Sequence, residues 1–289
     1  MPELRPAPPR RQSPTAAGVR IPLLSLLTAL LTLVVALPGT ALAASPTPGG
    51  KRPAHPERDW LGSTVRRHEP QPGRTPPPSL TASVEGVDVS SHNGNVPWST
   101  LWDSGNRFAY VKATEGTSYT NPYFAQQYDG SYDAGMIRGS YHFALPDNSS
   151  GAAQAAYFAT HGGGWSGDGK TLPGVLDIEY NPYGSVCYGM SGSALRSWIA
   201  DFLRTYRART GRDAMIYTAT GWWKQCTGNY GGFGSVNPLW IPRYGSSAGE
   251  LPAGWGFHTV WQYTDTGPTV GDHNRFNGSY SRLQALAGG

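Results

Sequence analysis

Residues 175–180 read Val-Leu-Asp-Ile-Glu-Tyr, a short run in which apolar side chains flank two carboxylic acids. The apolar residues at positions 175, 176 and 178 predict a strand that is buried on both sides. Because strand side chains alternate between two faces, Asp177 and Glu179 should point to the same side, with their Cα atoms about 6.7 Å apart. Two buried acids this close resist ionising together, which raises at least one pKa toward neutrality. A general acid needs such a pKa.

Seven further runs of β-branched or aromatic residues predict strands between residues 81 and 289. They cover 86–89, 108–112, 137–143, 214–218, 239–241, 259–263 and a weak run near 269. Helical patterns lie between several of them, one over 151–159 after a capping run Asn148-Ser149-Ser150, and one that follows Ser193 and stops at Gly211. Strands that alternate with helices predict parallel pairing through right-handed crossovers.

The connections after residue 218 are rich in glycine and too short for full helices. We therefore expect an α/β fold in which residues 81–289 form a single catalytic domain, an irregular and incomplete (β/α) barrel. In such a barrel the carboxyl ends of the strands meet at the active face. Asp88 and Asp272 stand in or after other predicted strands and should converge there with Asp177 and Glu179. A lone Asp-x-Glu would more often face solvent, but four converging acids favour glycoside hydrolysis.

Aromatic side chains give a second indication of a sugar site. Seven of them lie in or just beyond predicted strands: Tyr141, Tyr180, Tyr217, Trp240, Tyr244, Trp261 and Tyr263. Sugar rings pack their C–H faces on aromatic planes, and a rigid aromatic ring loses little entropy on binding. Each of these residues could instead pack in the core, but jointly they predict a substrate groove.

The distribution of charge argues against a nucleic-acid partner. The formal charge of +4 consists of +6 in residues 1–80 and −2 in residues 81–289. A protein that binds phosphate backbones carries its excess of Lys and Arg on the folded domain. The predicted domain is mildly acidic, so DNA or RNA is not expected to bind there.

The amino terminus has the pattern of an export signal. Four arginines precede an apolar stretch over residues 21–37, which small residues ending in Ala41-Leu42-Ala43 follow. Residues 1–44 are therefore predicted to be a secretory signal peptide. A stretch of 17 residues is shorter than the roughly 20 that a spanning helix needs, so we expect no stable membrane anchor.

Residues 45–80 contain nine prolines and six Lys or Arg. Such a composition predicts a linker or propeptide that is largely disordered, because it has little apolar surface to bury. The run Asp-Trp-Leu-Gly-Ser at 59–63 is the one part with side chains that could dock on another surface.

Cys187 and Cys226 are the only cysteines, and export to an oxidising compartment predicts a disulfide between them. Seven scattered histidines include no His-Glu-x-x-His spacing. We therefore expect neither a metal site nor a cofactor.

Seven motifs occur in the order found in one enzyme family. They are Gly-Val-Asp-Val-Ser at 86–90, Val-Lys-Ala-Thr-Glu-Gly at 111–116, Tyr-His-Phe at 141–143, Asp-Ile-Glu at 177–179, Leu-Trp-Ile at 239–241, Trp-Gln-Tyr at 261–263 and Asp-x-Asn at 272–274. The chain over 85–289 thus resembles glycoside hydrolase family 25, the Chalaropsis-type lysozymes or N-acetylmuramidases. The resemblance implies a β/α barrel that hydrolyses the β-1,4 bond between N-acetylmuramic acid and N-acetylglucosamine. Peptidoglycan glycan strands would be the partner of a secreted, monomeric enzyme.

The resemblance also implies roles for single residues. Glu179 matches the proton donor, and Asp177 matches the carboxylate that orients the 2-acetamido group of the substrate. Asp88 and Asp272 match the remaining acids. Glu115, in the second motif, is a further candidate for substrate binding.

Two other functions and two reaction courses stay open at this point. The domain could be a cell-wall binding module without turnover, or a chitinase-like glycosidase, whose acidic strand also ends in Asp-x-Glu. Positions 175 and 172, where chitinase-like enzymes carry additional aspartates, hold valine and leucine. Acetamido attack on the anomeric carbon would retain its configuration, whereas water activated by Asp88 or Asp272 would invert it.

Overall fold

The computed structural model describes residues 58–70 and 82–289 of the 289-residue chain. The predicted signal peptide over 1–44 lies outside these residues, as do 45–57 and 71–80 of the predicted linker and residue 81 of the predicted domain. Within the two described ranges, no helix combines the length and the apolar character that crossing a bilayer would require.

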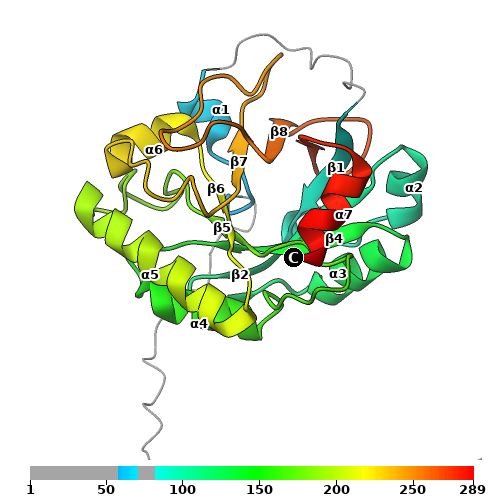
Figure 1. Cartoon of the computed structure of the whole chain (residues 1–289), viewed down its shortest axis with the longest axis horizontal. Coiled ribbons are helices and arrows are strands. Elements are labelled where there is room, and N and C mark those ends of the chain that lie inside the picture. The colour runs from blue at the N-terminus through cyan, green and yellow to red at the C-terminus, as the bar shows by residue number, and fades with distance from the viewer. Residues whose placement is uncertain (1–57, 71–81) are drawn as a thin grey trace, which may run out of the picture. The chain divides into compact units, whose positions relative to one another are not determined.

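Eight strands form a closed barrel in the order β1-β2-β4-β5-β6-β7-β8-β9, and β9 pairs with β1 to close it (Figure 1). Their bounds are β1 Val84–Val89, β2 Phe108–Glu115, β4 Ile137–Phe143, β5 Val175–Asp177, β6 Met215–Tyr217, β7 Leu239–Pro242, β8 Val260–Thr264 and β9 Asp272–Phe276. The two-residue strand β3, Tyr119–Thr120, forms a hairpin with the end of β2.

The helices of the described ranges lie around this barrel, and α4 and α5 pack side by side (Figure 1). They are α1 Val65–His68, the 3₁₀ helix η1 Ser91–Asn93, α2 Trp98–Asp103, α3 Phe124–Asp133, α4 Gly151–Thr160, α5 Gly192–Thr210, α6 Thr220–Thr227 and α7 Tyr280–Gly288. The connections β7–β8 and β8–β9 carry no helix. The expected irregular barrel is therefore confirmed, and its ring of helices is incomplete while its ring of strands is closed.

The last strand differs from the prediction in place and direction. It begins at Asp272 rather than near residue 269, and it runs antiparallel to both neighbours. Only residues 265–271 connect it to β8, and a parallel pair needs a crossover of a dozen residues or more. The short connection thus forces the reversal.

Side-chain alternation divides the core into an inner and an outer part. On β5, Val175 packs in the cluster inside the barrel, whereas Leu176 packs in the outer cluster under α4 and α5. Tyr110 and Trp240 pack against each other in the inner cluster. Strand β5 is buried on both sides, as predicted, but it ends at Asp177, three residues before the end of the predicted run at 175–180.

The long helix α5 has the predicted apolar face and the predicted end. Leu195, Trp198 and Phe202 are among its buried residues, and Gly211 caps its C-terminus with φ of +75°. Its N-cap is Ser191 and not Ser193, since the Ser191 hydroxyl accepts a hydrogen bond from the Ala194 amide. Helix α4 has the predicted cap, with the Ser150 hydroxyl accepting from the Ala153 amide.

The predicted disulfide is present. It joins Cys187, in the loop after β5, to Cys226 in α6, with Cα atoms 5.3 Å apart. The bridge closes a loop with a sequence separation of 39, which on the chain-entropy model stabilises the fold by about 4 kcal/mol.

We expect the double variant C187A/C226A to lose about this much unfolding free energy in urea titrations, with the wild-type barrel retained. A loss below about 1 kcal/mol would contradict the prediction.

Candidate active site

Asp177 and Glu179 lie inside the barrel mouth at the end of β5. Leu176 and Ile178 pack in the outer cluster, so the two acids between and after them face inward. Both are buried, Asp177 with 1% and Glu179 with 0% of its surface exposed. The alternation inferred from the sequence thus directs both carboxyl groups into the barrel.

Both carboxylate oxygens of Glu179 accept hydrogen bonds from residues of the segment 58–70. The Gly62 amide donates to Oε1 at 2.7 Å, and the Thr64 hydroxyl donates to Oε2 at 2.6 Å. Burial raises the pKa of Glu179 to about 7, although both donors lower it. A carboxyl group with this pKa can hold a proton at neutral pH.

Asp177 has no hydrogen-bond partner on either carboxyl oxygen within the described residues. Burial raises its pKa well above the ordinary value, and the nearby charge of Glu179 raises it further. A buried carboxyl group without partners is costly. Its oxygens are therefore free to accept a donor from a bound ligand.

Asp88 and Asp272 stand opposite each other where β1 pairs with β9. Gln262 of β8 bridges them, since its Nε2 lies 3.0 Å from Oδ2 of Asp88 and 3.2 Å from Oδ2 of Asp272. The Asn274 side chain donates to Asp88 at 2.7 Å. Burial raises the pKa of Asp88 to about 7 despite these donors, and burial together with Asp88 raises that of Asp272.

The structure thus connects three of the four acids, Glu179, Asp88 and Asp272, through shared partners. Tyr244 donates both to Gln262 and to the carbonyl of Gly62, whose amide bonds Glu179. Gln262 and Asn274 belong to the motifs at 261–263 and 272–274, but sequence reasoning did not single out their contacts with the acids. The sequence does not show which face of β8 lies inward, and the structure places Gln262 there, two residues beyond the inward-facing Val260.

An open cavity of about 360 Å³ lies beside Asp88 and Asp272. His92 and Thr269 line it from the barrel, and Trp60 of the segment 58–70 also lines it. The described chain therefore leaves part of the acidic site accessible.

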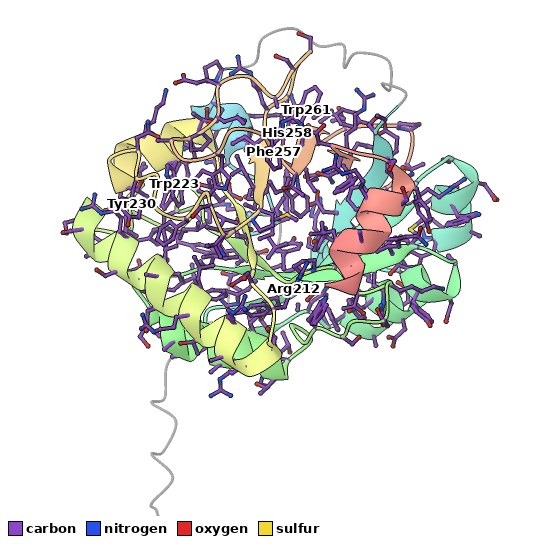
Figure 2. The ribbon with its side chains drawn as sticks, viewed as in Figure 1. Arg212, Trp223, Tyr230, Phe257, His258 and Trp261 are labelled. Atoms are coloured by element: carbon purple, nitrogen blue, oxygen red, sulfur yellow. A yellow bond between two sulfur atoms is a disulfide. The ribbon has the colours of Figure 1, made fainter. Side chains whose placement is uncertain are left out.

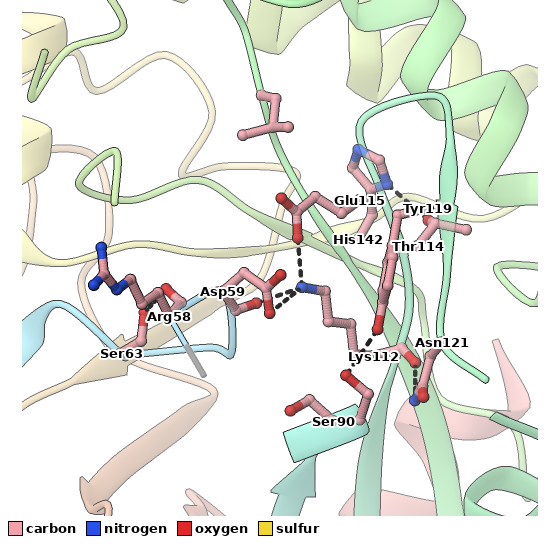
Figure 3. A network of polar contacts seen from close by, with 12 residues as sticks. Arg58, Asp59, Ser63, Ser90, Lys112, Thr114, Glu115, Tyr119, Asn121 and His142 are labelled. Carbon is pink, nitrogen blue, oxygen red and sulfur yellow. Dashed lines mark hydrogen bonds and ion pairs between the residues drawn. The ribbon is translucent and has the colours of Figure 1, made fainter. Parts of the chain in front are cut away.

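Glu115 belongs to a buried charge cluster next to the acids. Lys112 donates to Glu115 at 2.6 Å and forms an ion pair with Asp59 at 3.0 Å, and its side chain is fully buried (Figure 3). Burial alone would lower the pKa of Lys112, but Glu115 and Asp59 raise it above its ordinary value. Burial raises the pKa of Glu115 to about 8, against the influence of Lys112.

Among the predicted aromatic residues, Tyr141 and Tyr217 lie in the barrel interior near the acids. The hydroxyl of Tyr141 accepts from the Leu61 amide at 3.4 Å, and that of Tyr217 donates to Gln262 at 2.9 Å. Trp240 lies deeper, where its indole N–H donates to Asn274 at 2.9 Å. Its ring is fully buried, so it supports the site from below.

The remaining aromatic residues lie elsewhere. Tyr180 donates to Glu69 at 2.8 Å and stacks on His68, so α1 covers it. Trp261 packs in the outer cluster and donates to the carbonyl of Arg243 (Figure 2). Tyr263 donates to Glu85 on the same outer side. The structure does not bring Trp261 and Tyr263 together with the acids.

No group of three or more His, Cys, Asp or Glu side chains with the arrangement of a metal site occurs in residues 58–70 and 82–289. His142, the histidine of the Tyr-His-Phe motif, is fully buried and bonded to Thr114 and Gln154. Burial lowers its pKa to about 3, which keeps the ring neutral.

Comparison with known proteins places this site in a family. The family model described as glycosyl hydrolases family 25 matches residues 87–272. Lysozyme M1 of Streptomyces globisporus is 46% identical over 271 residues, which are 91% of this chain and 92% of that protein. The N,O-diacetylmuramidase of a Chalaropsis species is 47% identical over 211 residues, 72% of this chain and 100% of that one.

A solved structure has the same fold. The muramidase of Acremonium alcalophilum is 56% identical with a TM-score of 0.70, and the alignment covers 71% of this chain and 99% of the other. The rest of this chain has no counterpart there. The family model includes Asp88, Asp177, Glu179 and Asp272 among its matched residues. The chain therefore belongs to glycosyl hydrolase family 25.

Proposed function

We propose that this chain is a secreted, monomeric muramidase that hydrolyses the β-1,4 bond between N-acetylmuramic acid and N-acetylglucosamine of peptidoglycan. The observation that carries the proposal is the set of four buried carboxyl groups at the barrel mouth, all with raised pKa values. Glycoside hydrolysis needs such acids and neither metal nor cofactor. The names of the relatives, lysozyme and muramidase, supply the substrate class.

Glu179 acts as the general acid in this proposal. With residues 58–70 in place, burial raises its pKa to about 7, and a carboxyl group that is protonated at neutral pH can release its proton to the departing glycosidic oxygen. The C–O bond to the anomeric carbon breaks as the proton arrives on O4 of the leaving sugar.

Asp177 orients the acetamido group of the substrate. Its two buried oxygens lack partners, and the N–H of an acetamido group is a donor that could satisfy one of them. The acetamido oxygen would then attack the anomeric carbon, and water would open the resulting ring with net retention. Such substrate assistance is a recognised alternative to a carboxylate nucleophile.

Mass spectrometry of the soluble fragments from digested peptidoglycan tests the bond that is cleaved. We expect muramic acid at each new reducing end. Glucosamine at that end would contradict a muramidase, and a wall suspension that binds the protein but releases no fragments would indicate a binding module. Fragments from chitin with none from peptidoglycan would favour the chitinase-like alternative.

Proton NMR of the first-formed product tests the reaction course. Acetamido assistance by way of Asp177 predicts the β-anomer before mutarotation. A first-formed α-anomer would instead assign Asp88 or Asp272 as the base that activates water, since inversion needs a water on the opposite face of the ring.

Export is part of the proposal. It is supported by the arginine-rich, apolar and small-residue order of residues 1–44 and by the disulfide between Cys187 and Cys226.

A further inference from the structure

We propose that residues 58–69 form an inhibitory segment that occupies the catalytic pocket of their own chain and keeps glycan from reaching Glu179. The segment comprises a stretch over 58–64, which enters the barrel mouth, and helix α1 with Glu69, which binds the rim. Residues 59–63 are the part of the predicted linker with side chains able to dock, and the structure shows that this part is ordered and docked.

The segment contacts the acid itself. Both oxygens of Glu179 accept hydrogen bonds, from the Gly62 amide and from the Thr64 hydroxyl. The atoms that donate here occupy the space in which a glycosidic oxygen would have to lie to receive a proton. A carboxylate held by two donors also has its charged form favoured. Docking of the segment therefore opposes catalysis in two ways: it excludes the glycosidic oxygen from Glu179, and it favours the form of Glu179 that has no proton to donate.

Leu61 anchors the segment inside the barrel. Its side chain is fully buried in the inner cluster that also contains Tyr141, Tyr217 and Trp240. Its backbone is bonded on both sides, with the amide donating to Tyr141 and the carbonyl accepting from Gln262 at 3.0 Å. Tyr141, Tyr217 and Trp240, which were expected to bind substrate, thus belong to the same buried cluster as Leu61.

Charge complementarity fixes the start of the segment. Asp59 is fully buried and pairs with Lys112 (Figure 3). Its other carboxyl oxygen accepts from Tyr183 at 3.1 Å. Its main-chain carbonyl also accepts from Lys112. A buried aspartate would be strongly unfavourable without the lysine, so the barrel supplies a matched partner for this residue.

Gly62 fits its place so closely that no other residue could adopt it without a shift. Its φ is +90°, and an added Cβ would lie 2.5 Å from the Gln262 side-chain oxygen. The same Cβ would lie 2.8 Å from the hydroxyls of Tyr217 and Tyr244. A side chain at this position must therefore displace the segment from the residues that surround the acids.

Helix α1 and the residue after it hold the segment on the rim beside α6 (Figure 1). Glu69 accepts from the Tyr180 hydroxyl and from the Gly221 amide at 2.9 Å. Arg66 pairs with Asp265 in the loop after β8. The segment thus connects α6 with the loop after β8 across the mouth, which a contact at a single point of the surface would not do.

The variant Gly62→Val in the full chain tests the proposal, with Ser63→Ala as the matched control. Valine clashes with the pocket and is strained at positive φ, so the docked population should fall and hydrolysis of purified peptidoglycan should rise about tenfold or more. Among the residues that the structure describes, the Ser63 hydroxyl bonds the Arg58 carbonyl and no residue of the barrel, so its removal should leave the rate at the wild-type value.

Two further readouts separate this proposal from the proposed function. Co-sedimentation with intact peptidoglycan should show tighter binding by Gly62→Val than by wild type, whether or not the glycan is cleaved. Hydrogen exchange should show amide protection at 61 and 62 in wild type and its loss in Gly62→Val. Tighter binding without hydrolysis would reject the muramidase activity alone. If Gly62→Val loses the amide protection but binds and hydrolyses peptidoglycan as wild type does, the inhibitory role is overturned. If the amides at 61 and 62 are unprotected in wild type, the docking itself is overturned.

Discussion

Glu179→Gln should lower turnover on peptidoglycan by about 10³-fold, within the range that general acid catalysis contributes. Glutamine has the shape of glutamate but no acidic proton, so the leaving oxygen must depart as an alkoxide. The measurement is the initial rate of fragment release, made in the wild-type chain and again in the Gly62→Val background, where the segment 58–69 is expected to leave the pocket.

Glu250→Gln is the matched control, because Glu250 is exposed and pairs with Lys224 on the surface. Its rate should equal that of wild type. Circular dichroism should show the same fold for both variants. A Glu179→Gln enzyme that keeps more than about a tenth of the wild-type rate would show that another group donates the proton.

The position of the acids could be predicted because it depends on a local rule. Alternation along residues 175–180 places Asp177 and Glu179 on one face wherever that strand lies in the sheet. Burial then follows from the apolar residues at positions 175, 176 and 178. The same reasoning applies to α5, whose apolar face and glycine cap are both encoded within the helix.

The orientation of β8 could not be obtained in this way. Trp261 and Tyr263 alternate with Gln262, and whichever parity faces inward puts either two aromatic rings or one amide in the barrel. In the structure the amide faces inward, where Gln262 bonds Asp88 and Asp272, whereas Trp261 packs outside the barrel. A motif in the sequence names all three residues but contains no information on the face.

Contacts between segments that are distant along the chain could not be predicted from the sequence either. The composition of 45–80 predicts little burial, yet Leu61 is fully buried and Asp59 pairs with Lys112. Complementarity of this kind depends on the shape of the completed barrel. Residues 59–63 could be recognised as able to dock, but the surface that receives them could not.

Stability should fall as pH rises, which is the reverse of what surface carboxylates produce. Asp88 and Glu179 have pKa values raised to about 7, and those of Asp177 and Asp272 are raised as well. For an acid with a raised pKa in the folded state, the stabilisation is complete below the unfolded value, near 4, and is lost as pH rises through the folded value. The loss should therefore extend from about pH 4 to above pH 7.

His142 works in the opposite direction. Burial lowers its pKa to about 3, so it destabilises the fold as pH falls below the unfolded value of about 6.5. Burial lowers the pKa of His258 and His273 as well. These three histidines oppose five buried carboxyl groups whose pKa values are raised, namely Asp88, Glu115, Asp177, Glu179 and Asp272, and each unit by which a pKa is raised corresponds to about 1.4 kcal/mol. We therefore expect the free energy of unfolding from urea titrations to be lower at pH 8 than at pH 5 by several kcal/mol.

The variant Asp177→Asn identifies the source of this dependence. Asn has no proton to lose, so the difference between pH 5 and pH 8 should shrink by more than about 1 kcal/mol relative to wild type. Asp103→Asn, at an exposed position of α2, should leave the difference unchanged. If Asp177→Asn keeps the whole wild-type difference, Asp177 is ionised already at pH 5 and cannot be the protonated, desolvated group that its surroundings indicate. Because the same carboxyl group is proposed to orient the substrate, Asp177→Asn should gain stability at pH 8 while losing turnover. This opposition distinguishes a residue kept for function at the expense of stability from one that the fold merely tolerates.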